Sequence, residues 1–133
     1  MIGVLVVSHG RVAEELLQAA RTIVGDLPRA GAVSIGWSDD MNAARAAIER
    51  ALRELDSGDG VLVLTDMFGG TPTNVSLPFL SERVEIVTGV NLPMLIKLSS
   101  LRAGKLAEVA RAAAGEGQRH IYVASEILGP RPA

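Results

Sequence analysis

The sequence predicts an α/β protein, built as a doubly wound, mostly parallel sheet with helices on both faces. Apolar runs of strand length alternate with segments of helical period along the chain, which is typical of a parallel sheet connected by crossover helices. The 133 residues suffice for one domain with its own core. Because no repeat or low-complexity linker interrupts them, we expect a single domain over residues 1–133, with residues 130–133 as a frayed tail.

Five apolar runs are the candidate strands. They cover residues 2–7, 31–36, 60–65, 84–88 and 120–125. With right-handed crossovers we expect the spatial order 2-1-3-4 in chain numbering, and the last run as a C-terminal edge strand. A sheet of this kind places its functional groups beyond the carboxyl ends of its strands.

The first two helices are predicted from apolar residues that recur at intervals of three or four. In the first helix, which Gly25 ends, the predicted buried face consists of Val12, Leu16, Ala20 and Ile23. In the second helix it consists of Met41, Ala44, Ile48, Leu52 and Leu55. Ser38, Asp39 or Asp40 is available to cap the exposed amides at the start of the second helix.

Proline and glycine residues mark the later helices. A third helix is expected to open at Pro72, where a missing amide hydrogen costs nothing in the first turn, with Thr71 as its cap and Pro78 near its end. A fourth is expected from Asn91 onward, and Gly104 divides it from a later helical stretch.

Charge and composition exclude several classes of function. The formal net charge is -2, and lysine and arginine are spread along the chain, so nothing provides the basic surface that nucleic-acid binding requires. Without cysteine there are no disulfides or thiolate metal sites. The apolar N-terminal run lacks a basic leader and is too short to span a bilayer. We expect a cytoplasmic protein that does not insert into the membrane.

Three polar or glycine-rich segments follow predicted strands and should meet at one edge of the sheet. They are residues 8–10, 66–74 and 89–91. His9 lies between a strand and a helix N-terminus, where amide hydrogens and the helix dipole favour an anion such as a phosphoryl group. From its position alone, His9 could equally be a neutral histidine that ends the strand.

Asp66 is the candidate partner of His9. It follows a strand expected beside the first one, and a carboxylate there could accept the hydrogen of one ring nitrogen and leave the other nitrogen free. The alternative for Asp66 is an Asx turn or a loop cap.

The glycine-rich segment is a candidate anion site. Gly69 and Gly70 leave the backbone unobstructed, and Thr71 and Asn74 add a hydroxyl and an amide at a helix start, so the segment could hold phosphate oxygens. A plain tight turn is the alternative for the two glycines. The segment contains no lysine and is therefore not a nucleotide-binding P-loop.

Three further side chains have less decisive positions. Trp37 and Phe68 flank two of these loops and could form an apolar docking rim, but burial in the core is the favoured interpretation. His120 is interpreted as a surface or strand-edge residue.

Residues 7–10 (VSHG), 65–74 (TDMFGGTPTN) and 89–95 (GVNLPML) together resemble the mannose-type enzyme IIA domain of the bacterial phosphotransferase system. The resemblance spans nearly the whole chain, with the motifs in the right order. Many relatives have serine where this chain has Thr71, and either hydroxyl can donate a hydrogen bond.

The resemblance implies a phosphohistidine-forming phosphotransferase component. It implies a phosphoryl group on His9, a ring oriented by Asp66, and a hydrogen bond from Thr71 to the phosphoryl group. The donor would be the phosphocarrier protein HPr and the acceptor enzyme IIB, for sugar uptake or regulation, with no cofactor or metal. Members of the family are typically homodimers in which the C-terminal strand, here Ile121–Ser125, contributes to the interface.

Three other interpretations stay open at this point. Small tetrapyrrole chelatases resemble the His-Gly start, but His120 is the only other histidine available as a ligand. A regulatory module would use the same phosphorylation of His9 without moving a sugar. The related phosphotransfer subunit of dihydroxyacetone kinase is disfavoured, because residues 69–74 and 89–94 follow the mannose type.

Overall fold

The computed structural model describes residues 1–132, so of the expected tail, residues 130–133, Ala133 lies outside the described part. Its centre is a four-stranded sheet in which every neighbouring pair is parallel, and the spatial order β2-β1-β3-β4 confirms the prediction. The strands are β1 (Gly3–His9), β2 (Ala30–Ile35), β3 (Val61–Thr65) and β4 (Val84–Thr88).

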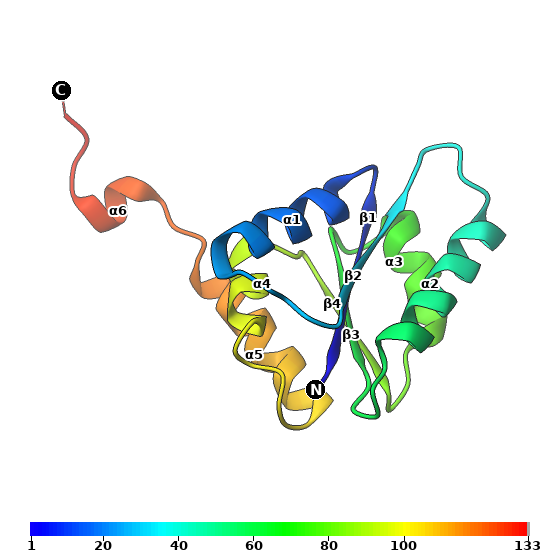
Figure 1. The fold of residues 1–133 in the computed structure, drawn as a ribbon. Coiled ribbons are helices and arrows are strands. Elements are labelled where there is room, and N and C mark those ends of the chain that lie inside the picture. The colour runs from blue at the N-terminus through cyan, green and yellow to red at the C-terminus, as the bar shows by residue number, and fades with distance from the viewer. Residues whose placement is uncertain (133) are drawn as a thin grey trace.

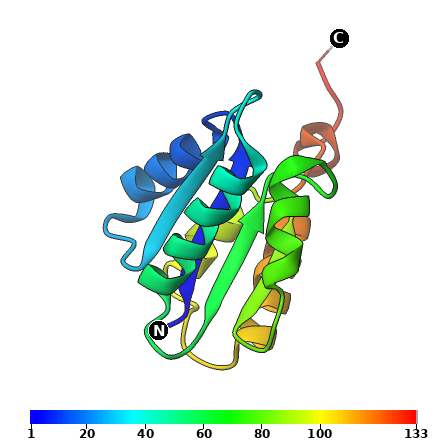
Figure 2. The ribbon, with the colours of Figure 1, turned by 90° about the vertical axis from the view of Figure 1, so that its right-hand side faces the viewer.

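Helices cover both faces of this sheet, as predicted (Figure 1). One face carries α1 (Val12–Val24), α4 (Leu92–Leu98) and α5 (Leu106–Arg119). The other carries α2 (Met41–Leu55) and α3 (Gly70–Ser76), which lie in front of the sheet in Figure 2. A short 3₁₀ turn, Leu77–Phe79, follows α3, and α6 (Ala124–Leu128) ends the chain.

The two central strands are apolar except at their carboxyl ends, because both of their faces are buried. In β1, Val4 and Val6 belong to the core beneath α1, α4 and α5, whereas Leu5 and Val7 belong to the core beneath α2. All four side chains are completely buried. Burying one such side chain contributes about 1.5–3 kcal/mol, so these strands anchor the sheet whose ends carry the site.

The predicted buried face of α1 is right at Ala20 and wrong at Val12 and Ile23. The buried positions are Ala13, Leu17 and Ala20, whereas Val12 and Ile23 are 46% and 58% exposed. Both sets recur every three or four residues, so periodicity could not separate them. The structure turns the small alanines toward the sheet, where a helix can then pack closely.

The start of α2 follows the prediction only in part. Ala44, Ile48 and Leu52 are buried, but Met41 lies in the first turn and is 46% exposed. Of the three candidate caps, Asp40 is the one that acts, accepting a hydrogen bond from the Asn42 amide at 3.1 Å.

The helices after β3 and β4 differ in how well their starts were predicted. Helix α3 begins at Gly70, two residues before Pro72, so Thr71 lies inside the helix and does not cap it. The predicted start of α4 is confirmed, because the Asn91 side chain accepts from the Met94 amide at 3.2 Å.

The expected fifth strand, residues 120–125, is absent from the described structure. Ile121, Tyr122 and Val123 form an extended, exposed connection that leads into α6, and α6 projects away from the body of the molecule (Figure 1). A strand needs a partner for its backbone groups, and within residues 1–132 the outer edge of β4 has no strand beside it. The prediction was therefore wrong for the isolated chain.

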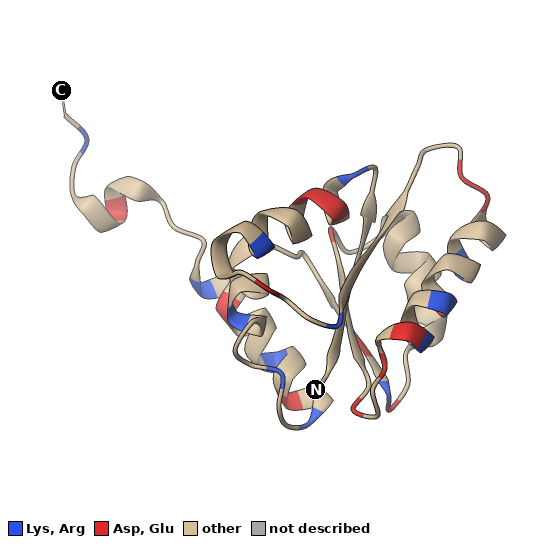
Figure 3. Cartoon of the chain, in the orientation of Figure 1, with Lys and Arg blue, Asp and Glu red and all other residues tan. Residues whose placement is uncertain are grey.

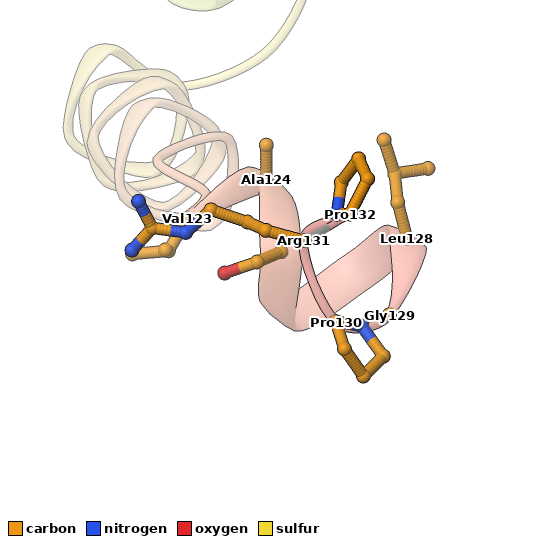
Figure 4. A pocket seen from close by; sticks show the side chains of 8 residues that line it. Val123, Ala124, Leu128, Gly129, Pro130, Arg131 and Pro132 are labelled. Atoms are coloured by element: carbon orange, nitrogen blue, oxygen red, sulfur yellow. The ribbon is translucent and has the colours of Figure 1, made fainter.

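The C-terminal segment lines an open hollow. Figure 4 shows the side chains around it, and its volume is about 630 Å³. All lining residues lie between positions 123 and 132, so this hollow is remote in sequence from the three polar loops.

Charged residues are distributed over the molecule. Lysine and arginine, blue in Figure 3, occur on helices and loops on both sides of the sheet, mixed with the acidic residues in red. Within residues 1–132, no helix combines the length and the apolar character that a bilayer crossing would need.

Candidate functional site

The carboxyl ends of β1 and β3 bring His9 and Asp66 together. The two strands are paired, with Val7 opposite Thr65, so the next polar residues of both strands emerge at the same edge of the sheet. The Asp66 Oδ2 atom lies 2.8 Å from His9 Nδ1 and 3.0 Å from the His9 amide nitrogen. The predicted pairing of these two residues is thus present in the structure.

This contact assigns the hydrogen on the imidazole ring. A carboxylate can only accept hydrogen bonds, so Nδ1 must carry the hydrogen that Asp66 receives. In the neutral ring, Nε2 then holds a free lone pair. The His9 side chain is 24% exposed and Asp66 17%, so the pair is largely shielded while the ring stays accessible.

The environment keeps Asp66 ionised. Burial would raise its pKa, but the hydrogen bonds from the His9 amide and ring, with the charge of the ring, outweigh burial and lower the pKa of Asp66. Its second oxygen, Oδ1, is buried and has no hydrogen-bond partner among the described residues. The carboxylate therefore remains a negative charge directed at the ring at neutral pH.

The Ser8 side chain hydrogen-bonds to the backbone of His9 and of α1. Its fully buried hydroxyl accepts from the Ala13 amide at 2.6 Å and donates to the His9 carbonyl at 3.1 Å. Because Arg11, at the N-cap position, makes no side-chain cap, the Ser8 hydroxyl replaces one. It thereby joins the end of β1 to the first turn of α1.

Gly70 approaches the far edge of the ring. A Cβ atom at this position would lie 2.9 Å from His9 Cε1 and 3.0 Å from Nε2, closer than such atoms come in proteins. Gly70 also has a φ of +77°, a conformation that residues with a side chain rarely adopt. The site therefore requires glycine here so that the loop can reach the free nitrogen.

Two buried threonines hold the loop that carries Gly70. Thr73 Oγ1 lies 2.6 Å from the Met67 carbonyl and 2.9 Å from Thr65 Oγ1. Thr73 donates its one hydroxyl hydrogen to the Met67 carbonyl, and the Thr65 hydroxyl contacts both Thr73 Oγ1 at 2.9 Å and the same carbonyl at 3.5 Å. Sequence reasoning missed this pair, because nothing in the order of residues shows that positions 65 and 73 meet.

The other predicted phosphoryl-binding residues are Gly69, Thr71 and Asn74, which lie close in sequence to Gly70. Gly69 precedes α3, and Thr71 and Asn74 lie within it. Thr71 is half-buried and Asn74 is exposed.

The third polar loop is structural. The amides of Gly89 and Val90 both donate to the Thr65 carbonyl at 2.9 Å, which places this loop beside the residue before Asp66. The Asn91 side chain caps α4 and donates to the Gly117 carbonyl at 3.1 Å. The polar groups of the Asn91 side chain therefore join α4 to α5.

The favoured interpretation of the two flanking aromatic residues is wrong. Trp37 is 89% exposed and Phe68 is 78% exposed, so neither is in the core. The Trp37 ring lies beside the His9 ring, with centroids 5.5 Å apart and planes inclined at 31°. The alternative of an apolar rim around the site agrees with this exposure, which Met67 shares.

His120 lies apart from these residues. It follows the C-terminus of α5, where its Nδ1 atom is 2.8 Å from the Glu116 carbonyl oxygen. Its side chain is 40% exposed, which confirms the surface interpretation. Within residues 1–132 no three histidine, cysteine, aspartate or glutamate side chains group as a metal site.

The fold and the site define a doubly wound α/β protein with a carboxylate-bound histidine at the carboxyl end of its sheet. Residues 3–118 match the EIIA-man family, described as "PTS system fructose IIA component". The chain belongs to this family. It is accordingly a transferase-type component of the sugar phosphotransferase system, whose chemistry is phosphoryl transfer.

Comparison with individual proteins agrees with this family. The chain is 33% identical to the PTS system fructose-specific EIIA component of Bacillus subtilis over 104 residues, which cover 77% of this chain and 71% of the relative. It is 34% identical to the mannose-specific EIIAB component of Escherichia coli, over 72% of this chain but 30% of that longer protein.

A solved structure shows the same fold. The mannose/sorbose specific IIA subunit from Enterococcus faecalis superposes with a TM-score of 0.84 at 31% sequence identity. The superposition covers 92% of this chain and 93% of the other.

Proposed function

We propose that His9 is the phosphoryl-carrying residue of this chain, acting as a single mannose-type IIA domain. The observation that carries the proposal is the 2.8 Å contact between His9 Nδ1 and Asp66 Oδ2. It leaves Nε2 as the nucleophile, at the edge of the ring that faces Gly70. An oriented nucleophile is the main requirement of such a reaction, since phosphoryl transfer depends chiefly on positioning and charge stabilisation.

The transfer balances without a metal or a nucleotide. The lone pair of His9 Nε2 forms a bond to phosphorus while the bond from phosphorus to the donor's ring nitrogen breaks, and that nitrogen recovers its electron pair. The His9 ring retains its Nδ1 hydrogen and so becomes cationic. The Asp66 carboxylate, 2.8 Å from Nδ1, stabilises this charge, and the reverse step returns the ring to its neutral form.

The loop after β3 would hold the phosphoryl oxygens. Backbone amides at Gly69 and Gly70 are unobstructed by side chains, and Gly70 already approaches Nε2. Thr71, in the first turn of α3, and Asn74, further along the same helix, would add a hydroxyl and an amide donor. The proposal assigns all four residues to phosphoryl binding.

The donor in this proposal is phosphorylated HPr and the acceptor is enzyme IIB. One relative is an EIIAB component, in which the A and B parts share one chain. The apolar rim of Trp37, Met67 and Phe68 beside His9 is suited to docking of such protein partners, because exposed aromatic residues and methionine are enriched at interfaces. Because a relay of this kind would operate in the cytoplasm, we propose that the protein acts there.

Intact-mass measurement after incubation with enzyme I, HPr and phosphoenolpyruvate tests the proposal. We expect one phosphoryl adduct that acid removes and that His9→Ala lacks. His120→Ala is the matched control, since it removes the other histidine from a position outside the site, and it should retain the adduct. An adduct that survives in His9→Ala would refute the assignment.

We also propose that the chain forms a homodimer through its C-terminal segment. Ile121, Tyr122 and Val123 are more than half exposed, and they run extended without a partner strand among the described residues. The outer edge of β4, beside a groove lined by residues of β4 and α5, offers free backbone groups. The segment of a second copy could pair with this edge, which an isolated chain leaves open.

A further inference from the structure

Trp37 lies on a hydrogen-bonded turn beside His9, and its side chain is almost fully exposed. The turn after β2 is closed from both sides: Asp39 Oδ2 accepts from the Gly36 amide at 2.6 Å, and the Asp39 amide donates to the Gly36 carbonyl at 3.2 Å. The Ile35 carbonyl also accepts from the Gly10 amide at 2.9 Å. The backbone on both sides of the two rings is therefore fixed.

The relative position of the rings suits an interaction with positive charge. Their centroids are 5.5 Å apart and their planes are inclined by 31°, so the imidazole lies within the range of about 6 Å in which a tryptophan face attracts a cation. The ring of His9 becomes cationic when Nε2 carries a phosphoryl group, as derived above. The indole therefore interacts more favourably with the phosphorylated ring than with the neutral ring.

We infer that Trp37 stabilises the phosphorylated state of His9 through the face of its indole ring. This inference rests on the proposed function, because it needs a phosphoryl group on Nε2. It assigns Trp37 a role distinct from docking. Contacts with a partner protein change the rate of phosphoryl exchange in both directions. Contact with the cationic ring changes the equilibrium constant, which sets how the phosphoryl group is divided between the two free proteins.

The equilibrium of phosphoryl exchange with HPr separates the two roles. Phosphorylated HPr and the full chain are mixed, and the four species are quantified by intact mass at equilibrium. For Trp37→Leu we expect the equilibrium constant for phosphorylating His9 to fall by about 2- to 5-fold, the size of an exposed cation–π interaction. Trp37→Phe, which keeps an aromatic face, should recover most of this loss.

Phe68→Leu is the matched control. It removes another exposed aromatic side chain of the rim, one that makes no ring contact with His9 in the described structure. We expect slower exchange with an unchanged equilibrium constant. If Trp37→Leu slows exchange without moving the equilibrium constant, the inference is overturned and Trp37 serves docking alone. If the variant changes neither, the inference is likewise overturned and Trp37 has neither role.

A second readout does not depend on HPr. Trp37 is the only tryptophan, and phosphoramidate can load histidine chemically. We expect loading of His9 to change the indole emission in wild type and to leave it unchanged in His9→Ala. Loading without an emission change would contradict the ring contact. Failure of HPr to phosphorylate the wild type, with successful loading by phosphoramidate, would instead refute the proposed donor.

Discussion

One oxygen of Asp66 holds both the ring and the backbone of His9: Oδ2 lies 2.8 Å from Nδ1 and 3.0 Å from the amide nitrogen. The two contacts act on different degrees of freedom, because the amide contact fixes the end of β1 and the ring contact fixes the tautomer and the ring direction. Loss of this carboxylate should therefore affect the direction of the nucleophile more than the fold.

Replacing Asp66 tests this separation. We expect Asp66→Ala to slow phosphorylation of His9 by about 100-fold, the cost of a displaced reacting group, as measured by rapid quench with phosphorylated HPr. The circular dichroism spectrum should not change, because the substitution removes an unpaired buried oxygen, Oδ1, together with the two contacts. An unchanged rate would remove Asp66 from the mechanism.

Asp66→Asn separates orientation from charge. The asparagine carbonyl can accept from Nδ1 and from the amide as the carboxylate does, but it provides no negative charge for the cationic ring. We expect a rate between those of wild type and Asp66→Ala. A rate equal to wild type would show that orientation alone matters.

Gly70 offers a test of the loop's approach to His9. A Cβ added here would come within 3.0 Å of the ring, so Gly70→Ala should displace either the ring or the loop and slow phosphoryl transfer at least 10-fold, on the order of the loss expected for a shift below 1 Å. Gly25→Ala is the matched control. Gly25, at the end of α1 and outside the site, has a similar φ of +86° but nothing within 4 Å of its added Cβ.

Both glycine variants should lose about 1–2 kcal/mol of stability from the strained backbone, as measured by urea unfolding. Only Gly70→Ala should lose most of its transfer rate. Equal losses of rate in the two variants would assign the effect to backbone strain and not to the contact with His9.

The pair of Thr65 and Thr73 should matter for both stability and rate. Thr73→Val keeps the shape of the side chain but removes its hydrogen bonds with the Met67 carbonyl and the Thr65 hydroxyl, which then have only their 3.5 Å contact with each other; the loss costs about 1–3 kcal/mol. We expect a lower midpoint in urea and a slower transfer, because the loop carrying Gly70 loosens. Thr73→Ser retains the hydroxyl and should restore the rate; a slow Ser variant would contradict this role.

The ion pair between Asp56 and Arg83 predicts a pH dependence of stability. Arg83 binds Asp56 through Nε and Nη2 at 2.7–3.1 Å, and this hydrogen bonding, with the amides of Gly58 and Gly60, lowers the pKa of Asp56 in the folded protein. The unfolded value is about 3.9. The contribution is therefore complete above that pH and is lost as the pH falls through the lower folded value.

Asp56→Asn checks the sign of this dependence. At pH 7 the variant should be less stable than wild type in urea, and the difference should shrink as the pH falls below about 4. High salt should also reduce the difference, because Arg83 is exposed. A difference that stays constant down to the acid transition would show that the charge of Asp56 does not contribute.

The proposed homodimer depends on backbone groups of the C-terminal segment. Proline at both Tyr122 and Val123 removes whichever amide faces the partner's β4 edge. Both side chains are exposed in the isolated chain, so the monomer should keep its fold. Sedimentation equilibrium should give a dimer for wild type and a monomer for this variant. Threonine at both positions keeps the amides and should preserve the dimer; a monomeric wild type would refute the proposal.

The sequence by itself determined the sheet. The apolar runs of β1 and β3 could be recognised because strands buried on both faces must be apolar throughout, and the order of strands followed from crossovers of fixed hand. The same rule predicted that His9 and Asp66 would emerge at one edge. Periodicity could not place the buried face of α1, because two sets of residues in that helix share the same spacing.

Only the tertiary structure decided what surrounds the pair. The contact of Gly70 with His9 joins segments that are distant along the chain. The hydroxyl pair of Thr65 and Thr73 and the exposure of Trp37 depend on the path of a loop. The run at residues 120–125 also shows that sequence alone does not decide the structure. Its residues favour a strand, but no partner strand lies beside it in the described chain. Local sequence determines which conformations a segment prefers, whereas contacts between segments determine which of them is realised.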